Sequence, residues 1–510
     1  MAASMAADSA LSPALRLQQS LFAGQGDDHR PRPSDADDLP GDLYCQTHGP
    51  AARRPHGITL TPPWLVESML DQLGADAFDT VIDCGAGTGR FSIAAAQRFP
   101  QARVLAVEQH PDMLRLLQER LKRSGLAQRV QVIEGDFRQV AIPRRGRCLF
   151  IGNPPYVRHH DIEPLWKAWY QGGMRACGIA ASQLAGLHLH FLLRAADLMQ
   201  AGDALCFVTS AEWLDNGYGS AARALLAGNS ALAVQSLWVA EPDEAVFPDA
   251  LVSCAVVHAR SAAGAPGNAV QAGAIGAQAL RPVRSVARAE FAASNRWSSW
   301  CRPTLAASAQ GIELGELFRV TRGQVTGGNR AWVLPADQQS LPAGLAVACV
   351  TRAQEIIDGS VQMPGAAKHF KRIVNLPRDL DSLSDEWRQA AERFVEHARA
   401  LGADQGYIAR HRKPWYALDM RSPPAAFVSY MGRRPPVFMP NPWRLTFINI
   451  AHGLYPRQPI TAATLQRVLA HLNTTTDIFS GRVYGGGMTK FEPSDVSRLR
   501  LPPSVLKAEA

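Results

Sequence analysis

Four consecutive residues, Asn153-Pro154-Pro155-Tyr156, have the chemistry to bind a planar amino compound and to expose its nitrogen. They follow a short apolar run, residues 148–152, that predicts a buried strand. The prolines fix the backbone, so the Asn153 carboxamide oxygen and the Pro154 carbonyl can accept hydrogen bonds from one amino group. The Tyr156 ring offers a flat face for stacking. This arrangement suits methyl transfer to an exocyclic or amide nitrogen, while an ordinary Asn-Pro turn is the simpler alternative.

A glycine-rich segment follows an earlier apolar run and predicts a cofactor-binding loop. Gly85, Gly87 and Gly89 recur at alternate positions, which lets the backbone turn tightly and approach a ligand closely. The spacing differs from the G-x-G-x-x-G of dinucleotide-binding proteins, so we do not expect a pyrophosphate. Asp83, before the loop, could hold an ammonium group. S-adenosylmethionine carries such a group, whereas a nicotinamide dinucleotide does not.

Acidic residues follow the next two predicted strands. Glu108 ends the run 103–108, at a position where an acid commonly binds ribose hydroxyls. Asp136 and Phe137 come after the run 130–134, where the carboxylate could accept from an adenine amino group while the ring packs on the base. Each acid alone is more often a helix cap or a surface charge. Their recurrence at successive strand ends predicts a site for S-adenosylmethionine.

Residues Thr61-Pro62-Pro63 precede an apolar pattern that continues to Leu70. They predict a helix capped by Thr61 with proline in its first turn. The simpler interpretation is a helix start alone. The functional interpretation is that the free N–H groups of this helix bind the carboxylate of the cofactor.

The elements that must position these residues alternate along residues 58–259. Strand-like runs alternate with helical patterns such as 112–123 and 183–200, which predicts a mostly parallel α/β sheet with helices on both faces. The predicted strands are 80–84, 103–108, 130–134, 148–152, 204–209, 234–239 and 251–259.

The length of 510 residues exceeds one ordinary core and indicates several domains. We expect a disordered segment at 1–45, a catalytic domain at 46–260, a Ser/Ala/Gly-rich linker at 261–300 and a second domain at 301–510. The eight cysteines are scattered singly without a CxxC pair, so neither a metal site nor a disulfide framework is expected. No apolar run approaches the ~20 residues that span a bilayer, and no signal peptide is evident.

Charge separates the two halves of the chain. Residues 301–510 contain 26 Lys and Arg against 17 Asp and Glu, whereas residues 1–300 contain 27 and 28. A basic domain beside a neutral one fits a module that binds a polyanion, although a solvated basic surface is the alternative. Arg410, Arg412, Lys413, Arg433 and Arg434 are candidate phosphate contacts.

These motifs, in this order, resemble the gamma-class (TaqI-like) N6-adenine DNA methyltransferases, which are class I S-adenosylmethionine-dependent enzymes. The resemblance is specific over about residues 57–259 and looser to about 503. It implies a Rossmann-like class I methyltransferase sheet followed by a C-terminal α+β target-recognition domain. It also implies that Phe247, which precedes Pro248, stacks on the target base. The segment 322–329 resembles the opening of such a recognition domain.

The activity that the resemblance implies is site-specific methylation of the N6 amino group of a flipped-out adenine in double-stranded DNA. Asn153, Pro154, Pro155, Tyr156 and Phe247 would form the catalytic pocket. N4-cytosine methylation is the nearest alternative, although its enzymes more often carry Ser in place of this Asn. RNA and protein-glutamine methyltransferases are more distant alternatives. We expect a monomer in a bacterial cytoplasm, with a cognate restriction endonuclease, where one exists, as a separate protein.

Overall fold

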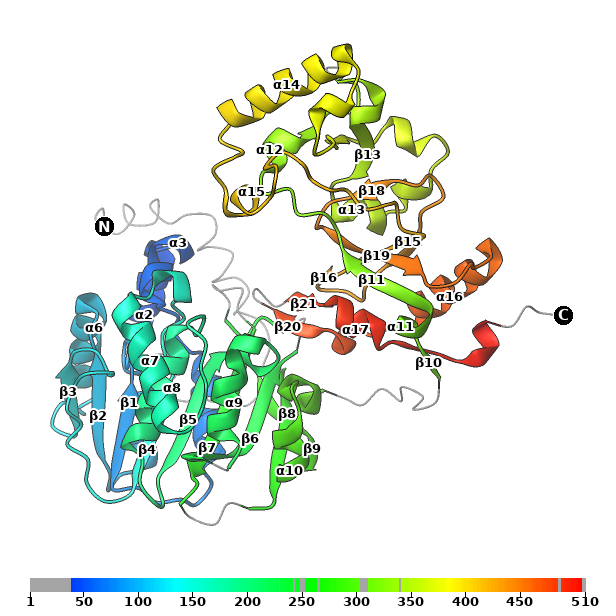
Figure 1. Ribbon diagram of the computed structural model, residues 1–510. Helices are drawn as coiled ribbons and strands as arrows, with labels where there is room; N and C mark the ends of the chain where they lie inside the picture. Colours follow the sequence, from blue (N-terminus) through cyan, green and yellow to red (C-terminus); the bar gives the residue numbers. More distant parts are fainter. Residues whose placement is uncertain are drawn as a thin grey trace, which may run out of the picture.

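The computed structural model describes residues 38–228, 230–241, 244–247, 253–263, 267–276, 278–302, 311–338, 341–484 and 488–506. Two folded parts follow one another along the chain, the first ending near residue 302 and the second beginning near residue 311 (Figure 1). No helix within these ranges is long and apolar enough to cross a membrane.

A nine-stranded sheet in the order β3-β2-β1-β4-β5-β7-β6-β8-β9 forms the first part. Strands β1 to β5 are parallel, whereas β7 is antiparallel to both of its neighbours. The predicted α/β sheet is therefore confirmed. The strands are β1 (Thr80–Cys84), β2 (Arg103–Glu108), β3 (Val130–Glu134), β4 (Cys148–Gly152), β5 (Ala204–Ser210), β6 (Leu232–Ala240), β7 (Cys254–Ser261), β8 (Ala269–Gly276) and β9 (Ala279–Ala287).

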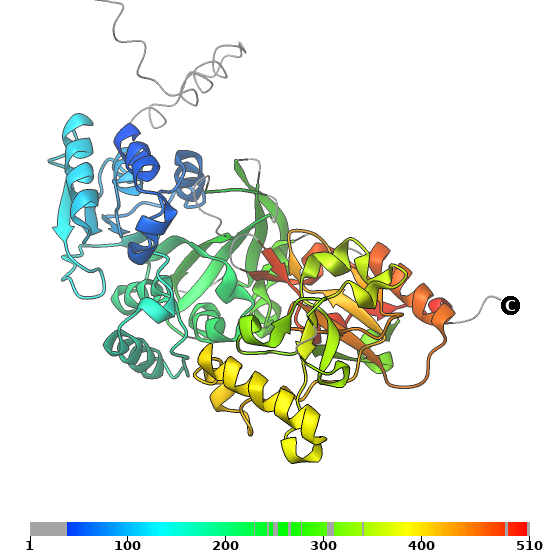
Figure 2. The ribbon, with the colours of Figure 1, turned by 90° about the horizontal axis from the view of Figure 1, so that it is seen from above.

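Helices cover both faces of this sheet (Figure 2). Side chains alternate along each strand. Cys148 and Phe150 of β4 therefore join one core, whereas Leu149 and Ile151 join the other. Helices α7, α8 and α9 contribute to the first core, and α4, α5 and α6 to the second. The helices are α2 (Leu39–Thr47), α3 (Pro50–Arg53), α4 (Pro63–Asp71), α5 (Arg90–Arg98), α6 (Pro111–Arg123), α7 (Pro164–Ala176), α8 (Leu187–Leu198), α9 (Ser220–Leu226) and α10 (Arg288–Ala293).

The predicted linker at 261–300 is wrong. Strands β8 and β9 extend the sheet there, and Trp297 is fully buried in the core beside α10. The small residues that suggested a linker have a packing role. A Cβ atom on Gly273 would lie 2.2 Å from the Trp238 ring, so only glycine lets β8 pair closely with β6 at this point. The first domain therefore extends to about Arg302.

The predicted disorder at 1–45 is wrong for its last residues, because helix α2 begins at Leu39 and Asp38 before it is buried. Residues 1–37 lie outside the described part of the chain. The Asp-Leu-Pro sequence at 38–40 is a helix-start signal. The polar and small residues around it masked that signal.

The second part is an α+β domain built on two four-stranded sheets, β11-β19-β15-β17 and β12-β14-β13-β18. Its strands are β10 (Ile312–Glu313), β11 (Phe318–Arg322), β12 (Val333–Leu334), β13 (Ala346–Val350), β14 (Arg372–Val374), β15 (Ala426–Ser429), β16 (Met431–Gly432), β17 (Phe438–Pro440), β18 (Thr446–Phe447), β19 (Ala451–Pro456), β20 (Arg482–Tyr484), β21 (Met488–Lys490) and β22 (Arg500–Leu501). Its helices are α11 (Leu314–Leu317), α12 (Asn329–Trp332), α13 (Ala353–Ile357), α14 (Asp385–Ala400), α15 (Tyr407–Arg410), α16 (Ala462–Thr475) and α17 (Pro493–Ser497).

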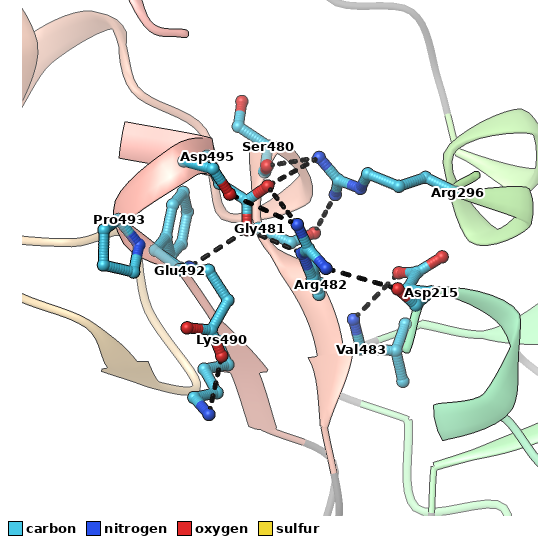
Figure 3. A network of polar contacts seen from close by, with 12 residues as sticks. Asp215, Arg296, Ser480, Gly481, Arg482, Val483, Lys490, Glu492, Pro493 and Asp495 are labelled. Atoms are coloured by element: carbon cyan, nitrogen blue, oxygen red, sulfur yellow. Dashed lines mark hydrogen bonds and ion pairs between the residues drawn. The ribbon is translucent and has the colours of Figure 1, made fainter. Parts of the chain in front are cut away.

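The buried carboxylate of Asp215 joins the two parts (Figure 3). It accepts hydrogen bonds from the Ser298 hydroxyl at 2.6 Å and from the Val483 backbone N–H at 3.2 Å. Val483 lies in β20 of the second part, yet its side chain belongs to the core of the first. Arg296 donates to the carbonyls of Ser480 and Gly481 beside it. The second domain is therefore fastened just after the carboxyl end of β5.

Asp215→Ala should lower the stability of the whole protein by about 1–3 kcal/mol, because it leaves buried donors of both domains without an acceptor. Thermal unfolding and hydrogen exchange of residues 482–484 measure the effect. Glu241→Gln, which neutralises the half-buried ion-pair partner of Arg281, is the control. Unchanged exchange at β20 in Asp215→Ala would show that this contact does not hold the domains together.

Candidate active site

The predicted site residues meet at the carboxyl edge of the parallel strands. Asp83, Glu108, Asp136 and Asn153 stand at or just beyond the ends of β1, β2, β3 and β4. Ligands bind at this edge in open α/β sheets. A cavity of about 440 Å³ opens there, a volume within the usual range for small-molecule sites. Its lining includes Gly57, Thr59, Gly85, Gly87, Glu108, His110, Met113, Phe137, Asn153 and Pro155.

The glycine loop has the backbone conformation that its sequence predicts. Gly85, Gly87 and Gly89 have φ angles of 94°, 55° and 85°, which side-chain-bearing residues rarely adopt. The Gly87 N–H donates to Glu108 Oε2 at 2.7 Å. The glycine loop is thus fixed directly to the end of β2 in the wall of the cavity.

Glu108 uses most of its acceptor capacity within the protein. Besides Gly87, the backbone N–H groups of Gln109 and His110 donate to its Oε1, each at 2.8 Å. A carboxylate offers about four acceptor positions, so about one is left for a ligand hydroxyl. The three protein bonds hold the carboxylate in a fixed orientation at the cavity wall.

Asp83 is fully buried, and only one of its two oxygens has a partner. Oδ2 accepts from the Ser92 hydroxyl at 2.6 Å, whereas Oδ1 has no hydrogen-bond partner. Burial raises the pKa of this carboxyl to about 7, against the opposing effect of the Ser92 hydrogen bond. An unpartnered buried carboxylate oxygen is costly unless a cation or a donor approaches it.

Asp136 is engaged by a neighbour rather than facing the cavity. Arg138 binds it in a two-pronged ion pair, with Nη2 2.5 Å from Oδ2. The same guanidinium lies 3.8 Å from the centre of the Trp166 ring. Gly135 and Phe137 line the cavity, and Asp136 is not among its lining residues. Phe137 therefore stands where predicted, while the Asp136 carboxylate would have to turn from Arg138 to meet a base.

Asn153 is held through its amide nitrogen alone. Nδ2 donates to the Thr59 carbonyl at 3.0 Å and to the Thr61 hydroxyl at 3.1 Å. Oδ1 is buried and has no hydrogen-bond partner among the described residues. The two acceptors also fix the amide orientation, because a flipped amide would place oxygen against the Thr59 carbonyl. The side chain therefore presents an unused hydrogen-bond acceptor at the cavity.

Thr61 thus has a different role from the cap that its sequence predicts. Helix α4 begins at Pro63 with Pro62 in the cap position, and no side chain caps it. The Thr61 hydroxyl orients Asn153 instead. This contact was invisible in the sequence because the two residues are 92 positions apart.

Tyr156 and Phe247 lie close together, but not as the two sides of a slot. Their ring centres are 6.4 Å apart and their planes are almost perpendicular, at 86°. A base stacked between two rings needs about 7–8 Å between parallel faces. Phe247 is 2% exposed and packs in the core. The structure brings the rings together, and the stacking of a base between them stays a prediction that requires one ring to turn.

Residues that no sequence motif indicated bring the amino-terminal segment to the site. Gly57 has a φ of 65°, and a Cβ atom there would lie 2.5 Å from the Tyr156 nitrogen. Its carbonyl accepts from that N–H at 3.3 Å. His56 and His110 also line the cavity, with ring centres 4.8 Å apart. Only an isolated glycine beside the Thr61 segment signalled this approach in the sequence.

Comparison with known proteins supports the assignment of this edge as a methyltransferase site. A general methyltransferase domain model matches residues 81–171, and the Eco57I restriction-modification methylase model matches residues 139–235. The model of the C-terminal domain of the Type II methyltransferase M.Eco57I matches residues 303–510. The Type II methyltransferase M.XamI of Xanthomonas campestris pv. amaranthicola is 42% identical over 452 residues, which cover 88% of this chain and 85% of that protein. The chain belongs to the Type II DNA methyltransferases of restriction-modification systems.

Other proteins match the chain with lower identity or over a shorter stretch. The Type II methyltransferase M.AccI of Acinetobacter calcoaceticus is 20% identical over 68% of this chain and 67% of its own length. Release factor glutamine methyltransferase of Moorella thermoacetica is 38% identical, but only over 18% of this chain and 32% of that protein. The fold resembles the Type IIL restriction-modification enzyme MmeI in complex with DNA, with a TM-score of 0.57, 10% identity, and coverage of 90% of this chain and 70% of that one.

The Type II methyltransferase uses S-adenosylmethionine, and the cavity fits this cofactor. Glu108 lines the cavity, and its remaining acceptor position suits a hydroxyl. Asp83 is fully buried and does not line the cavity, so it can meet a cationic group only after a rearrangement. The Phe137 ring supplies an apolar wall. When bound, the cofactor supplies an electrophilic methyl group.

The raised pKa of Asp83 predicts a pH effect on the stability of this methyltransferase. The folded protein binds the proton more tightly than the unfolded chain, so this contribution is largest below about pH 4 and is lost as pH rises to about 7. Asp83→Asn removes the titration. Its free energy of unfolding relative to that of the natural protein should therefore rise between pH 5 and 7, by at most about 1.4 kcal/mol per pH unit.

Thermal unfolding without cofactor at several pH values measures this difference. Asp197→Asn, which changes an exposed carboxylate, is the control and should give a nearly constant difference. The same constant difference for Asp83→Asn would contradict the raised pKa.

Proposed function

We propose that this Type II methyltransferase methylates the N6 amino group of an adenine flipped out of double-stranded DNA. The observation that carries the proposal is the unused, buried Oδ1 of Asn153, which is held at the cavity by the two hydrogen bonds of its Nδ2. This oxygen can bind a ligand that donates a hydrogen bond from an N–H group. The exocyclic amino group of adenine is such a donor.

The target must leave the duplex, because an amino group inside the base stack cannot reach this cavity. Unstacking costs a few kcal/mol, and stacking on aromatic rings returns about 1–3 kcal/mol per base. We assign the stacking faces to Tyr156 and Phe247. Phe247 or Tyr156 must then turn from its perpendicular arrangement when the base enters.

Asn153 and Pro154 act on the geometry of the amino nitrogen. Its lone pair is delocalised into the ring, which makes it a poor nucleophile. Asn153 Oδ1 and the Pro154 carbonyl each accept a hydrogen bond from one of its two N–H groups. The nitrogen then moves toward tetrahedral geometry, and its lone pair becomes available for the methyl group. The acceptors stabilise the positive charge that develops on nitrogen, so they bind the transition state better than the ground state. The extra proton leaves to solvent after transfer.

The second domain offers a basic groove for the DNA. A hollow of about 520 Å³ is lined by Arg322, Gln324, Arg412 and Arg421 together with backbone of the 320–325 strand and turn. Arg322 and Arg421 are exposed, and one carboxylate, that of Glu492, pairs with Arg322 at 2.6 Å. Arg412 donates to the Thr326 carbonyl at 2.9 Å and so fixes the turn. We assign this groove to phosphate and base contacts, which charge complementarity supports.

The 322–329 segment that resembled the opening of a recognition domain begins in this groove. Of the predicted phosphate contacts, Arg412 lines it, and Arg410 lies on the adjoining helix α15. We also propose that the enzyme acts as a monomer in the bacterial cytoplasm and that any cognate endonuclease is a separate protein.

Modification-sensitive sequencing of DNA from cells with and without the protein tests the function. We expect N6-methyladenine at every copy of one short motif, only in cells that express the enzyme. N4-methylcytosine at such a motif would show that the target is cytosine, the nearest alternative to adenine. No change in either base would overturn the proposal, provided that the purified protein binds S-adenosylmethionine.

A further inference from the structure

We propose that Asp38 is a positioning residue that ties the cofactor loop and Asn153 to the amino-terminal segment. Its carboxylate is 4% exposed and lies immediately before helix α2. It does not line the cofactor cavity. Its effect must therefore act through the residues that it touches, and those residues lead to the site by two paths.

The first path reaches the cofactor loop. Asp38 Oδ2 accepts from the Thr88 hydroxyl at 2.7 Å, and Thr88, between Gly87 and Gly89, is 1% exposed. Arg120, whose Nε is 3.4 Å from Asp38 Oδ1, donates to the Thr88 carbonyl at 2.8 Å. The hydroxyl and the carbonyl of Thr88, at the centre of the glycine loop, are thus both held by the buried ion pair of Asp38 and Arg120. Glycines on either side give this loop no rigidity of their own.

The second path reaches the catalytic amide. Arg90 Nε donates to Asp38 Oδ2 at 2.5 Å, and its Nη1 donates to the Thr61 carbonyl at 2.9 Å. The Thr61 hydroxyl in turn accepts from Asn153 Nδ2. Asp38, Arg90, Thr61 and Asn153 therefore form one continuous chain of contacts. This part of the inference rests on the proposed role of Asn153.

Burial makes this carboxylate hard to replace. The side chains of Arg90 and Arg120 are 10% and 5% exposed, so neutral Asn at position 38 would remove a buried counter-ion from both guanidiniums and leave Arg90 paired with the exposed Asp42. Helix α2 closes directly over the carboxylate, since a Cβ atom on Gly41 would lie 2.6 Å from both oxygens. Asp42 also binds Arg90, at 2.6 Å, but it is 57% exposed.

Asp38 and Asp42 bind the same arginine, but one is buried and the other exposed, and this difference provides the test. Asp38→Asn should weaken S-adenosylmethionine binding about ten- to hundredfold and slow single-turnover methylation at saturating cofactor about tenfold or more. Asp42→Asn, the matched control, should change both less than about threefold because exposed pairs contribute little. Titration calorimetry with S-adenosylmethionine and rapid-quench methylation of DNA give the two numbers.

A merely structural role would lower the melting temperature without changing the site. Hydrogen exchange of residues 85–91 at a temperature where the variant is folded should therefore increase in Asp38→Asn and not in Asp42→Asn. If Asp38→Asn does not fold, Asp38→Glu takes its place in these measurements. It keeps the charge but displaces the carboxylate, so we expect the same changes at a smaller size. Natural cofactor affinity and methylation rate in the folded Asp38 variant would overturn the inference. An inactive natural enzyme with normal cofactor binding would instead overturn the proposed function.

Discussion

The two hydrogen bonds from Asn153 Nδ2 to Thr59 and Thr61 are the constraint on which the site depends. An asparagine amide can present either its donor or its acceptor end to a ligand, and these bonds decide which. By using the nitrogen, the protein leaves the oxygen unpaired in a buried position. In the proposed function, this free acceptor at the end of β4 binds an N–H group of the target. The hydrogen bonds of the amide nitrogen would then decide which kind of target the oxygen can bind.

Those contacts come from a segment distant in sequence. The stretch before α4 lies against the Asn153 turn because Gly57 lets the two backbones approach. The sheet brings β1, β2 and β4 to a common edge, where Glu108 and the Asn153 amide border one cavity. Beyond β5, Asp215 fastens the second domain to the same edge. The cavity, the Asn153 turn and the contact that fastens the second domain thus lie at or just beyond the carboxyl ends of the parallel strands.

The sequence predicted the parts of this site that are local. Strands β1 to β4 each contain a short apolar run and follow one another regularly, and the glycine loop and tetrapeptide are continuous motifs. It could not predict contacts between distant residues, such as Arg138 turning to Asp136 or Thr61 orienting Asn153. Composition misled at β8, where glycine and alanine accommodate Trp238, and at Asp38, which lies in a polar stretch. The perpendicular Phe247 ring depends on packing that no motif encodes.

The central claim is that Asn153 Oδ1 accepts a hydrogen bond from the amino group that becomes methylated. Single-turnover methyl transfer by purified Asn153→Ala, with S-adenosylmethionine affinity measured on the same sample, tests it most directly. We expect nearly natural cofactor affinity and a transfer rate lower by about 10²–10³, the usual effect of removing one group that stabilises developing charge. A transfer rate close to that of the natural enzyme would contradict it.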